Sequence, residues 1–546
     1  MYFKFSKKKR LLALIIICSI FINKTFAQRT AINDSTPQGK RIEFIKAERY
    51  NRQVLDSNKV FLSLAGNAIV QQDKTLFYAD SILLNERENT LEAFGNVHIN
   101  DADSIHTYAQ YVKYLGKEKR AFLKNKVRLT DGKGTLTTND LTYDVGIKIG
   151  TYVNGGKIVN GKTTLTSTEG YYYGDVRDVY FKRKVILINP EYKIYTDTLL
   201  YNLNTEIANF VCPTKILNGK RTITTKEGFY DLKTKKGKFL SRSQIDDSTY
   251  TFTADKMAME DSSGFGEFIG NAVYKTKDSL NGQDLIANNI KTNKKTNTFL
   301  ATQKPILLIR QDADTTYISA DTLYSGRLTD IVGFRNFQLH GKAQPKNMKF
   351  NFNKDSSNNR FFEAYYNVKI YNDSLQANAD SMFYSSYDSV FRLMKNPIAW
   401  ARDNQLTGDT IYLFTKKQKP HKLEVWENAI SISKVAKTFY NQVRGNTING
   451  FFKNGQIDTL IAKGTPAENV YYAEDEYKKL IGVNSSTCDV ITVNFLNNKP
   501  QRVVFVNNLA GTMYPIKQVN HESIRVKGFL WLDDKRPKSK FDILGN

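Results

Sequence analysis

A short pattern of apolar, small and acidic residues recurs along the chain. In the segment Phe77–Ile82, an apolar residue stands three positions before Asp80, a small residue one position before it, and a second apolar residue two positions after it. The same pattern surrounds Asp197, Asp255, Asp321 and Asp380. Weaker copies centre on Glu48, Gln110, Asp140, Glu169, Glu227, Asp284 and Asp409. A recurring pattern of this kind predicts a fold built from stacked units.

The spacing of the copies is regular. From Glu48 to Asp284 the successive steps are 32, 30, 30, 29, 28, 30, 28 and 29 residues. Asp321 follows after 37 residues, Asp380 after a further 59, which is close to two periods, and Asp409 after 29. The sequence therefore predicts a structural unit of about 29 residues that repeats through most of the chain.

Gly-Asn pairs separate several copies, at Gly66-Asn67, Gly95-Asn96 and Gly270-Asn271. Both residue types tolerate positive φ, which is typical of tight turns. We therefore expect each unit to hold two or more short strands joined by such turns. The chain also has 31 Tyr and 33 Phe among many Thr, Ile and Val residues. This composition favours strands, and the predicted fold class is all-β with antiparallel strands.

The position of the apolar residues around each acid constrains the strand. Ala79 stands one residue before Asp80 and Ile82 two residues after it. In a flat strand this odd step puts the two apolar side chains on opposite faces. Either both faces are buried, or a bulge or corner at the Ala-Asp pair returns the apolar residues to one side. We favour the bulge, which leaves the acid outside, bound to local amides, as a structural and not a catalytic residue.

The repeated segments resemble a known family. Leu91–Ile99, Leu76–Ser81 and Gly66–Val70 are similar to the turn-and-strand segments of the OstA-like (LptA-like) proteins of lipopolysaccharide transport, and copies recur in register from about residue 42 to about 412. The resemblance implies a repetitive antiparallel β-jellyroll or V-shaped slit, a solenoid-like stack of strands whose apolar interior shields the acyl chains of lipid A. It also implies docking with other lipopolysaccharide-transport components through the end strands.

On this resemblance, the apolar residues nearest the acids are candidate lipid-binding residues of the slit. They are Phe77, Ala79, Ile82, Phe252, Ala254, Met257, Ile318, Ala320 and Leu323. The same positions would equally fill an ordinary packed core, and the pattern does not choose between an open slit and a closed core. The chain is several times longer than a minimal member of the family, so one subunit would do the work of several stacked ones.

The N-terminus has the layout of a secretory signal. Lys7–Arg10 are basic, Leu11–Ile22 are mostly apolar, and Thr25-Phe26-Ala27 places small residues at the positions that a signal peptidase reads. The apolar run is about a dozen residues, whereas a membrane span needs about 20. We therefore expect cleavage after Ala27 and export to the periplasm, with association with the outer membrane as a further expectation.

The chain is strongly basic. Removing the six basic residues of the signal region lowers the net charge from +25 to +19. A field of this sign attracts polyanions. Because export separates the protein from nucleic acid, lipid phosphates, anionic glycolipid or acidic polysaccharide are the expected partners; an alternative is that the charge only keeps the protein soluble. Cys212 and Cys488 remain after cleavage, and the sequence leaves their pairing open.

No motif points to catalysis, so we expect no catalytic residue, metal or cofactor. The histidines fit no metal-ligand motif, and neither a Gly-x-Ser-x-Gly elbow nor a phosphate-binding loop is present. A β-helix polysaccharide lyase is the enzymatic alternative, but its rungs would be parallel and shorter. The second alternative is an exported structural or polysaccharide-binding β-rod, similar to an adhesin, with a filled core. The five histidines are His98, His106, His340, His421 and His521.

The chain divides into a signal peptide and three further parts. They are residues 1–27 (signal peptide), 28–345 (OstA-like repeats), 346–473 (further repeats) and 474–546 (a hairpin region and basic tail). In the last part, Ile491–Phe495 and Arg502–Val506 alternate and predict a hairpin. The basic end, Lys535–Lys540, is interpreted as a solvated tail, with peripheral contact to a membrane surface or a partner as the alternative.

Overall fold

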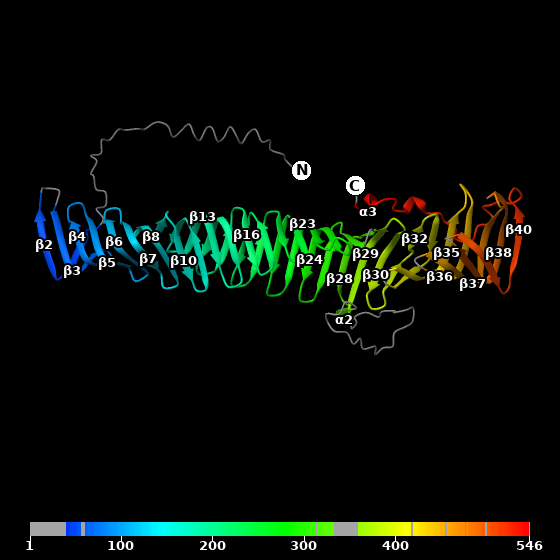
Figure 1. The fold of residues 1–546 in the computed structure, drawn as a ribbon, viewed down its shortest axis with the longest axis horizontal. Helices are drawn as coiled ribbons and strands as arrows, with labels where there is room; N and C mark the ends of the chain where they lie inside the picture. The colour runs from blue at the N-terminus through cyan, green and yellow to red at the C-terminus, as the bar shows by residue number, and fades with distance from the viewer. Residues whose placement is uncertain are drawn as a thin grey trace, which may run out of the picture.

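The computed structural model is an elongated stack of antiparallel strands (Figure 1). It describes residues 40–544 except 56–59, 312–313, 332–358, 417–418, 454–455, 478 and 497–498. This part of the chain contains forty strands, two short α-helices and one 3-10 helix. The repetitive, antiparallel all-β fold is therefore confirmed. The predicted signal peptide lies outside the described residues, and the predicted domain boundaries stay a prediction.

The strands run in chain order from one end of the stack to the other. The first group is β1 Glu43–Lys46, β2 Arg49–Val54, β3 Val60–Gln72, β4 Thr75–Asn85, β5 Thr90–Asp101, β6 Ile105–Leu115, β7 Arg120–Thr130, β8 Gly134–Asp144, β9 Ile149–Tyr152, β10 Gly156–Asn160, β11 Thr163–Ser167, β12 Glu169–Tyr173, β13 Asp178–Ile188, β14 Lys193–Asn202, β15 Ile207–Phe210, β16 Thr214–Asn218, β17 Arg221–Thr225, β18 Gly228–Asp231, β19 Lys236–Phe239 and β20 Ser243–Asp246. The second group is β21 Tyr250–Ala254, β22 Lys256–Glu260, β23 Phe265–Thr276, β24 Gln283–Asn293, β25 Thr298–Thr302, β26 Ile306–Gln311, β27 Asp314–Ser319, β28 Thr322–Arg327, β29 Arg360–Tyr371, β30 Gln376–Ser385, β31 Val390–Met394, β32 Ile398–Ala401, β33 Asn404–Thr407, β34 Thr410–Lys416, β35 Lys419–Lys434, β36 Tyr440–Lys453, β37 Gln456–Glu474, β38 Leu480–Leu496, β39 Lys499–Val506 and β40 Ala510–Pro515. The helices are α2 Leu328–Ile331, η1 Asp533–Lys535 and α3 Phe541–Leu544.

The chain passes back and forth across the stack, and we call each pass a crossing. Each crossing bends in the middle, which creates two layers. In β4, the half before Asp80 pairs with one half of β3, and the half after Asp80 pairs with the other. We call the layer that contains the half before the acid layer A and the other one layer B. The long strands contribute to both layers, whereas other crossings are split at the bend into two short strands. Layer A thus includes β1, β10, β11, β16, β17, β20, β21, β26, β27, β32, β33 and β40, and layer B includes β2, β9, β12, β15, β18, β19, β22, β25, β28, β31, β34 and β39.

A bulge on the adjacent strand accompanies the bend, and in β3 it has two residues. Opposite Asp80, β3 carries Gly66 and Asn67 with φ of 81° and 46°, and the strand register shifts there. The bend turns the chain so that Ala79 and Ile82 are both buried while Asp80 is exposed. The predicted return of the apolar residues to one side, with the acid outside, is therefore confirmed. The bulge that we favoured at the Ala-Asp pair lies instead on the neighbouring strand β3, and the chain turns a corner at Asp80.

The predicted position of the Gly-Asn pairs was wrong. Gly66-Asn67, Gly95-Asn96 and Gly270-Asn271 do not join short strands; they lie inside the long strands β3, β5 and β23. The reason is that positive φ suits a bulge as well as a hairpin turn, so the residue types do not distinguish the two.

The acids and the bulge residues form a ladder along this edge, which we call the corner ridge. The Nδ2 of Asn96 donates to Asp80 at 3.0 Å, and that of Asn271 donates to Asp255 at 2.9 Å. Bonds from Asn271 and Arg242 lower the pKa of Asp255. The acids thus bind local amides, as predicted. Equivalent acid–Asn pairs are Glu48–Asn67, Asp321–Asn367, Asp409–Asn428 and Asp489–Asn508.

Two of the weaker copies were placed on the wrong residue. The bend that we assigned to Asp284 lies at Asn288. The backbone N–H of Asn288 donates to the carbonyl of Gln303 in the opposite bulge. Asp284 is instead buried in β24, where it forms an ion pair with Arg310. Similarly, the backbone N–H that donates to the bulge, at the carbonyl of Arg183, belongs to Thr168 and not to Glu169. An Asn or Thr fills the same position because the bend needs a backbone donor there and not a carboxylate.

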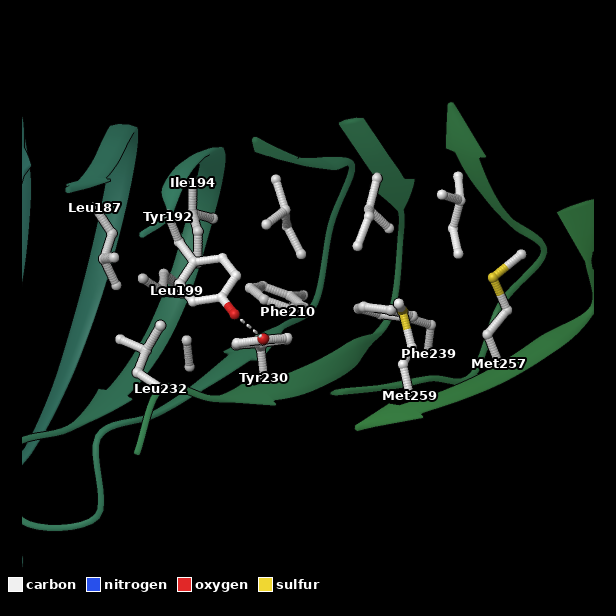
Figure 2. Packing of buried hydrophobic residues seen from close by; sticks show 14 of the residues in the cluster. Leu187, Tyr192, Ile194, Leu199, Phe210, Tyr230, Leu232, Phe239, Met257 and Met259 are labelled. Atoms are coloured by element: carbon white, nitrogen blue, oxygen red, sulfur yellow. Dashed lines mark hydrogen bonds between the residues drawn. The ribbon is translucent and has the colours of Figure 1, made fainter. Parts of the chain in front are cut away.

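One continuous hydrophobic core lies between the layers. It extends from Ile42 to Val493. Rings from successive crossings pack along its axis, as Phe210, Tyr230 and Phe239 do (Figure 2). The core continues from one crossing to the next because every bend returns the apolar residues to the inner face. The predicted hairpin of the C-terminal region is also confirmed, since β38 and β39 pair antiparallel.

The corner ridge should require glycine at positions where the backbone is left-handed. A Gly95→Ala variant should destabilise the bend by about 1–2 kcal/mol, because Gly95 has a left-handed φ of 73° and the added Cβ would clash with a carboxylate oxygen of Asp80. Gly146→Ala is the control, because its Cβ would meet its nearest neighbour at 3.4 Å, an ordinary contact. Hydrogen exchange of β4–β6 measures the effect. Equal protection in the two variants would show that the bulge does not need glycine.

Candidate functional site

The edge opposite the corner ridge is where the hairpin turns of the two layers face each other, and we call it the mouth. Over the first two thirds of the stack, its layer A turns are residues 73–74, 102–104, 131–133, 161–162, 189–192, 219–220, 247–249 and 277–282, and its layer B turns are 86–89, 116–119, 145–148, 174–177, 203–206, 232–235, 261–264 and 294–297. The mouth is thus the line along which the two layers meet without a continuous backbone.

Polar side chains hold the mouth closed. Asp131 of layer A accepts a hydrogen bond from the hydroxyl of Tyr172 at 3.1 Å, and Nε of Arg177 lies 3.1 Å from the same carboxylate. Asp101 accepts from Tyr143 at 2.8 Å. Because these contacts are between side chains, they can separate without breaking the strand ladders on either side.

The densest group of contacts surrounds Asp261. Its carboxylate accepts from Arg221 at 2.9 Å and from the hydroxyls of Tyr192 and Tyr230 at 3.0 Å each. The two hydroxyls are also bonded to each other at 2.5 Å (Figure 2). Burial acts to raise the pKa of Asp261, but the charge and hydrogen bonds of Arg221 and the tyrosines outweigh it and lower the pKa. Burial raises the pKa of Tyr192 to about 12, so its hydroxyl stays a donor at neutral pH.

The mouth contacts follow a periodic tyrosine that the sequence analysis missed. Five layer B tyrosines recur at steps of 29 residues, and four of them donate to a polar group of the mouth: Gln72, Asp101, Asp131 and Asp261. A search for tyrosine at the repeat period would have found them. The five are Tyr114, Tyr143, Tyr172, Tyr201 and Tyr230.

The mouth of the C-terminal third is closed by the chain's own end. Residues 516–544, here called the C-terminal strap, run back from β40 past β35 towards α3 (red in Figure 1). Three buried glutamines of layer A, Gln376, Gln405 and Gln442, bind it. Gln405 donates to the carbonyl of Leu530 and accepts from the N–H of Leu532, both at 2.7 Å.

The interpretation of the chain end as a solvated tail was therefore wrong. Phe529 and Trp531 pack on Tyr440, and Nε of Arg536 donates to Gln376 at 2.8 Å. The basic composition of the end suggested solvation, but these contacts hold its backbone and aromatic residues against the stack.

The nine predicted slit residues all lie in the core, with exposed fractions between 0 and 8%. They form three groups, one around each of the bends at Asp80, Asp255 and Asp321, and are not brought together at one site. Phe252 stacks on Phe268 with ring centroids 3.6 Å apart. In this structure the described part of the interior is packed at these positions. Their role in lipid binding stays a prediction.

Other candidate groups are structural in position. Cys212 and Cys488 are free thiols, and burial raises the pKa of Cys488. His98 and His106 are hydrogen-bonded to each other at 3.1 Å between ring nitrogens. Within the residues that the structure describes, no group of three or more potential ligands could hold a metal ion, and no helix is both long and apolar enough to span a membrane.

A comparison with family models identifies the repeat. A model described as OstA-like protein matches residues 40–197 and 193–255. This region is OstA-like. It contains the bends at Asp80 and Asp255 and the mouth contacts of Asp101 and Asp131, and the same layers continue beyond it. Among proteins with curated functions, no significant match to the chain was found.

The contacts of Asp261 at the mouth should be sensitive to acid. Because the pKa of Asp261 is lowered by folding, its contribution to stability is complete above the ordinary carboxyl pKa of about 4 and is lost as the pH falls through the lower folded value. Asp261→Asn should cost about 1–3 kcal/mol at neutral pH and remove the acid dependence. Hydrogen exchange of residues 232–235 measures both. Asp247→Asn, in a neighbouring turn, is the control and should change neither; equal behaviour of the two variants would contradict the assignment.

Loss of the glutamine contacts should detach the strap from the stack. Gln405→Leu removes both bonds to the strap, so residues 516–544 should become sensitive to protease while β32 and β33 stay protected. Gln244→Leu, on the exposed face of layer A, is the matched control. If the strap of the Gln405 variant resists protease as well as the wild type does, the glutamine contacts do not hold it.

Proposed function

We propose that this OstA-like protein binds a lipopolysaccharide-type glycolipid and carries it with the acyl chains between layers A and B. The observation that carries the proposal is the single apolar core, from Ile42 to Val493, bounded by a corner ridge on one edge and by side-chain contacts on the other. Such an interior can accept acyl chains at any crossing, provided that the mouth opens.

The length of the core suits a transport path. About 28 strands in each layer, at about 4.8 Å per strand, give a length of about 130 Å. Exposing one methylene of an acyl chain to water costs about 0.8 kcal/mol of free energy. A continuous apolar path removes this cost along the whole length and requires no chemical step, which is why we propose a carrier and not an enzyme.

The packed interior determines how loading must occur. Because Phe77 and Phe252 are buried against other side chains, a lipid can enter only if the layers separate. The corner ridge is continuous backbone, whereas the mouth is held by contacts such as Asp131–Tyr172. Lipid entry therefore proceeds by separation of the mouth, with the ridge as the fixed edge.

The net charge supports attraction of the lipid headgroup, and the N-terminal edge strand supports docking of another transport component. A net charge of +19 after cleavage at Ala27 would attract headgroup phosphates. At the N-terminal end, β2 has every side chain exposed, and among the described strands it pairs with β3 alone. This free edge would accept a strand of another transport component. We propose the periplasm as the site of action.

One observation favours a second function, a structural or polysaccharide-binding rod. In this structure the core is filled and the mouth is closed, as a rod that never opens would require. The two functions differ in a single measurable property, the presence of lipid between the layers.

Photo-crosslinkers placed at Phe77 and Phe252 test for that lipid. The chain is exported with its own N-terminal segment, purified without detergent, and irradiated with lipopolysaccharide. We expect both positions to crosslink lipid, because both side chains lie in the core. Phe94, 42% exposed on the outer face, is the control and should remain free of lipid. Labelling at Phe94 alone, or at none of the three, would support the rod.

A charge in the core should block loading. Phe252→Arg places a cation where Phe252 is 3% exposed, so lipid bound at equilibrium should fall at least about tenfold in protein that remains folded by circular dichroism. Phe94→Arg carries the same change on the outer face and should load normally. Equal loading of the two folded variants would exclude Phe252 from the path, whatever the crosslinking result.

A further inference from the structure

A basic pocket opens at the mouth, midway along the stack. It has a volume of about 620 Å³, within the range of small-molecule sites. Turns of both layers form it, so it lies across the line along which the layers would separate. Its lining residues are Glu191, Tyr192, Asn218, Lys220, Arg221, Lys233, Thr234, Lys235, Asp247, Asp261, Ser262 and Lys294.

Cations outnumber carboxylates in this pocket by five to three. Within the pair Arg221–Asp261 and within the pair Lys235–Glu191, at 2.7 Å, the two charges neutralise each other. The other charged lining residues are the three lysines Lys220, Lys233 and Lys294 and one carboxylate, Asp247, so the pocket keeps an excess of positive charge.

Lys220 and Lys294 have no ion-pair partner in the part of the chain that the structure describes. Lys233 lies 3.7 Å from Glu206 and donates one hydrogen bond to the carbonyl of Asn204, which leaves further N–H donors on its ammonium group. All three side chains are exposed and come from different turns, one of layer A and two of layer B. Three ammonium groups around one pocket, each with free N–H donors, match the three oxygens of a phosphate group.

The pocket is also in contact with the apolar core. Tyr192 lines the pocket, yet it is 3% exposed and belongs to the core, where it meets Tyr230 beside Leu232 (Figure 2). A molecule held here by a charged group would therefore have its apolar part directly above the interior. This combination fits an amphipathic anion better than a soluble one.

We propose that this pocket binds the phosphate of a phosphorylated glycolipid, through Lys220, Lys233 and Lys294, while the acyl chains enter the core through the mouth below it. The proposal rests on the proposed function and adds to it a fixed place for the headgroup. It also gives the Asp261 group a position at the point of entry, since Arg221 and Asp261 line the pocket.

The test compares two triple variants of the full exported chain. Lys220→Gln/Lys233→Gln/Lys294→Gln removes the pocket cations. Lys215→Gln/Lys238→Gln/Lys275→Gln removes three exposed lysines from the outer faces of the same crossings, with the same change in net charge.

Three probes separate the sources of phosphate: diphosphoryl lipid A in phosphatidylcholine vesicles, the same lipid with both phosphates removed, and free glucosamine 1-phosphate. We expect the pocket variant to bind diphosphoryl lipid A about tenfold more weakly than the wild type. Its binding of dephosphorylated lipid should be unchanged, and the outer-face variant should behave as the wild type with every probe. Free glucosamine 1-phosphate should bind the wild type weakly and the pocket variant more weakly still.

The other outcomes are distinguishable. Equal losses in the two variants would show that net charge and not the pocket attracts the lipid, which overturns the inference. Unchanged binding of diphosphoryl lipid A by the pocket variant also overturns it, and lipid carriage would stand. If neither lipid binds any variant but glucosamine 1-phosphate still depends on the pocket lysines, the proposed lipid function fails and a soluble phosphate site replaces the headgroup site.

Discussion

The bend at the corner ridge is the constraint on which the rest of the structure depends. A strand alternates its side chains between two faces, so a straight crossing would put half of the apolar residues on the outside. The bend at Asp80 and the two left-handed residues Gly66 and Asn67 opposite it return both halves to one interior. Repeated at each crossing, this device converts a sheet that would have two wet faces into two layers around one core.

Because of this bend, the two edges of the stack are held together by contacts of different strength. The ridge is formed by continuous backbone and by bonds such as Asn96–Asp80, whereas the mouth is held by side chains from separate turns. In the C-terminal third the strap replaces those side chains through Gln405. An opening motion would therefore begin at the mouth, where Asp261, its two tyrosines and the surrounding lysines lie.

Much of the fold could be predicted from the sequence because the bend constrains residue types locally. The small-acid pair and the period of about 29 residues gave the repeat and the exposed acid. The Gly-Asn pairs were misplaced because positive φ is common to bulges and turns. The mouth was missed because its partners, such as Tyr143 and Asp101, are 42 residues apart and meet only once the layers are stacked. The docking of the strap depends on glutamines between 84 and 160 residues away, which no local pattern reveals.

In the proposed function, the mouth separates while the ridge stays fixed when lipid enters. Spin labels at Lys133 and Asn204, whose side chains meet across the mouth at 3.2 Å, test it most directly. Their dipolar coupling should weaken when lipopolysaccharide is added, while a pair at Gln110 and Lys126 on the ridge should keep its coupling. Lipid that binds with both couplings unchanged would contradict the account.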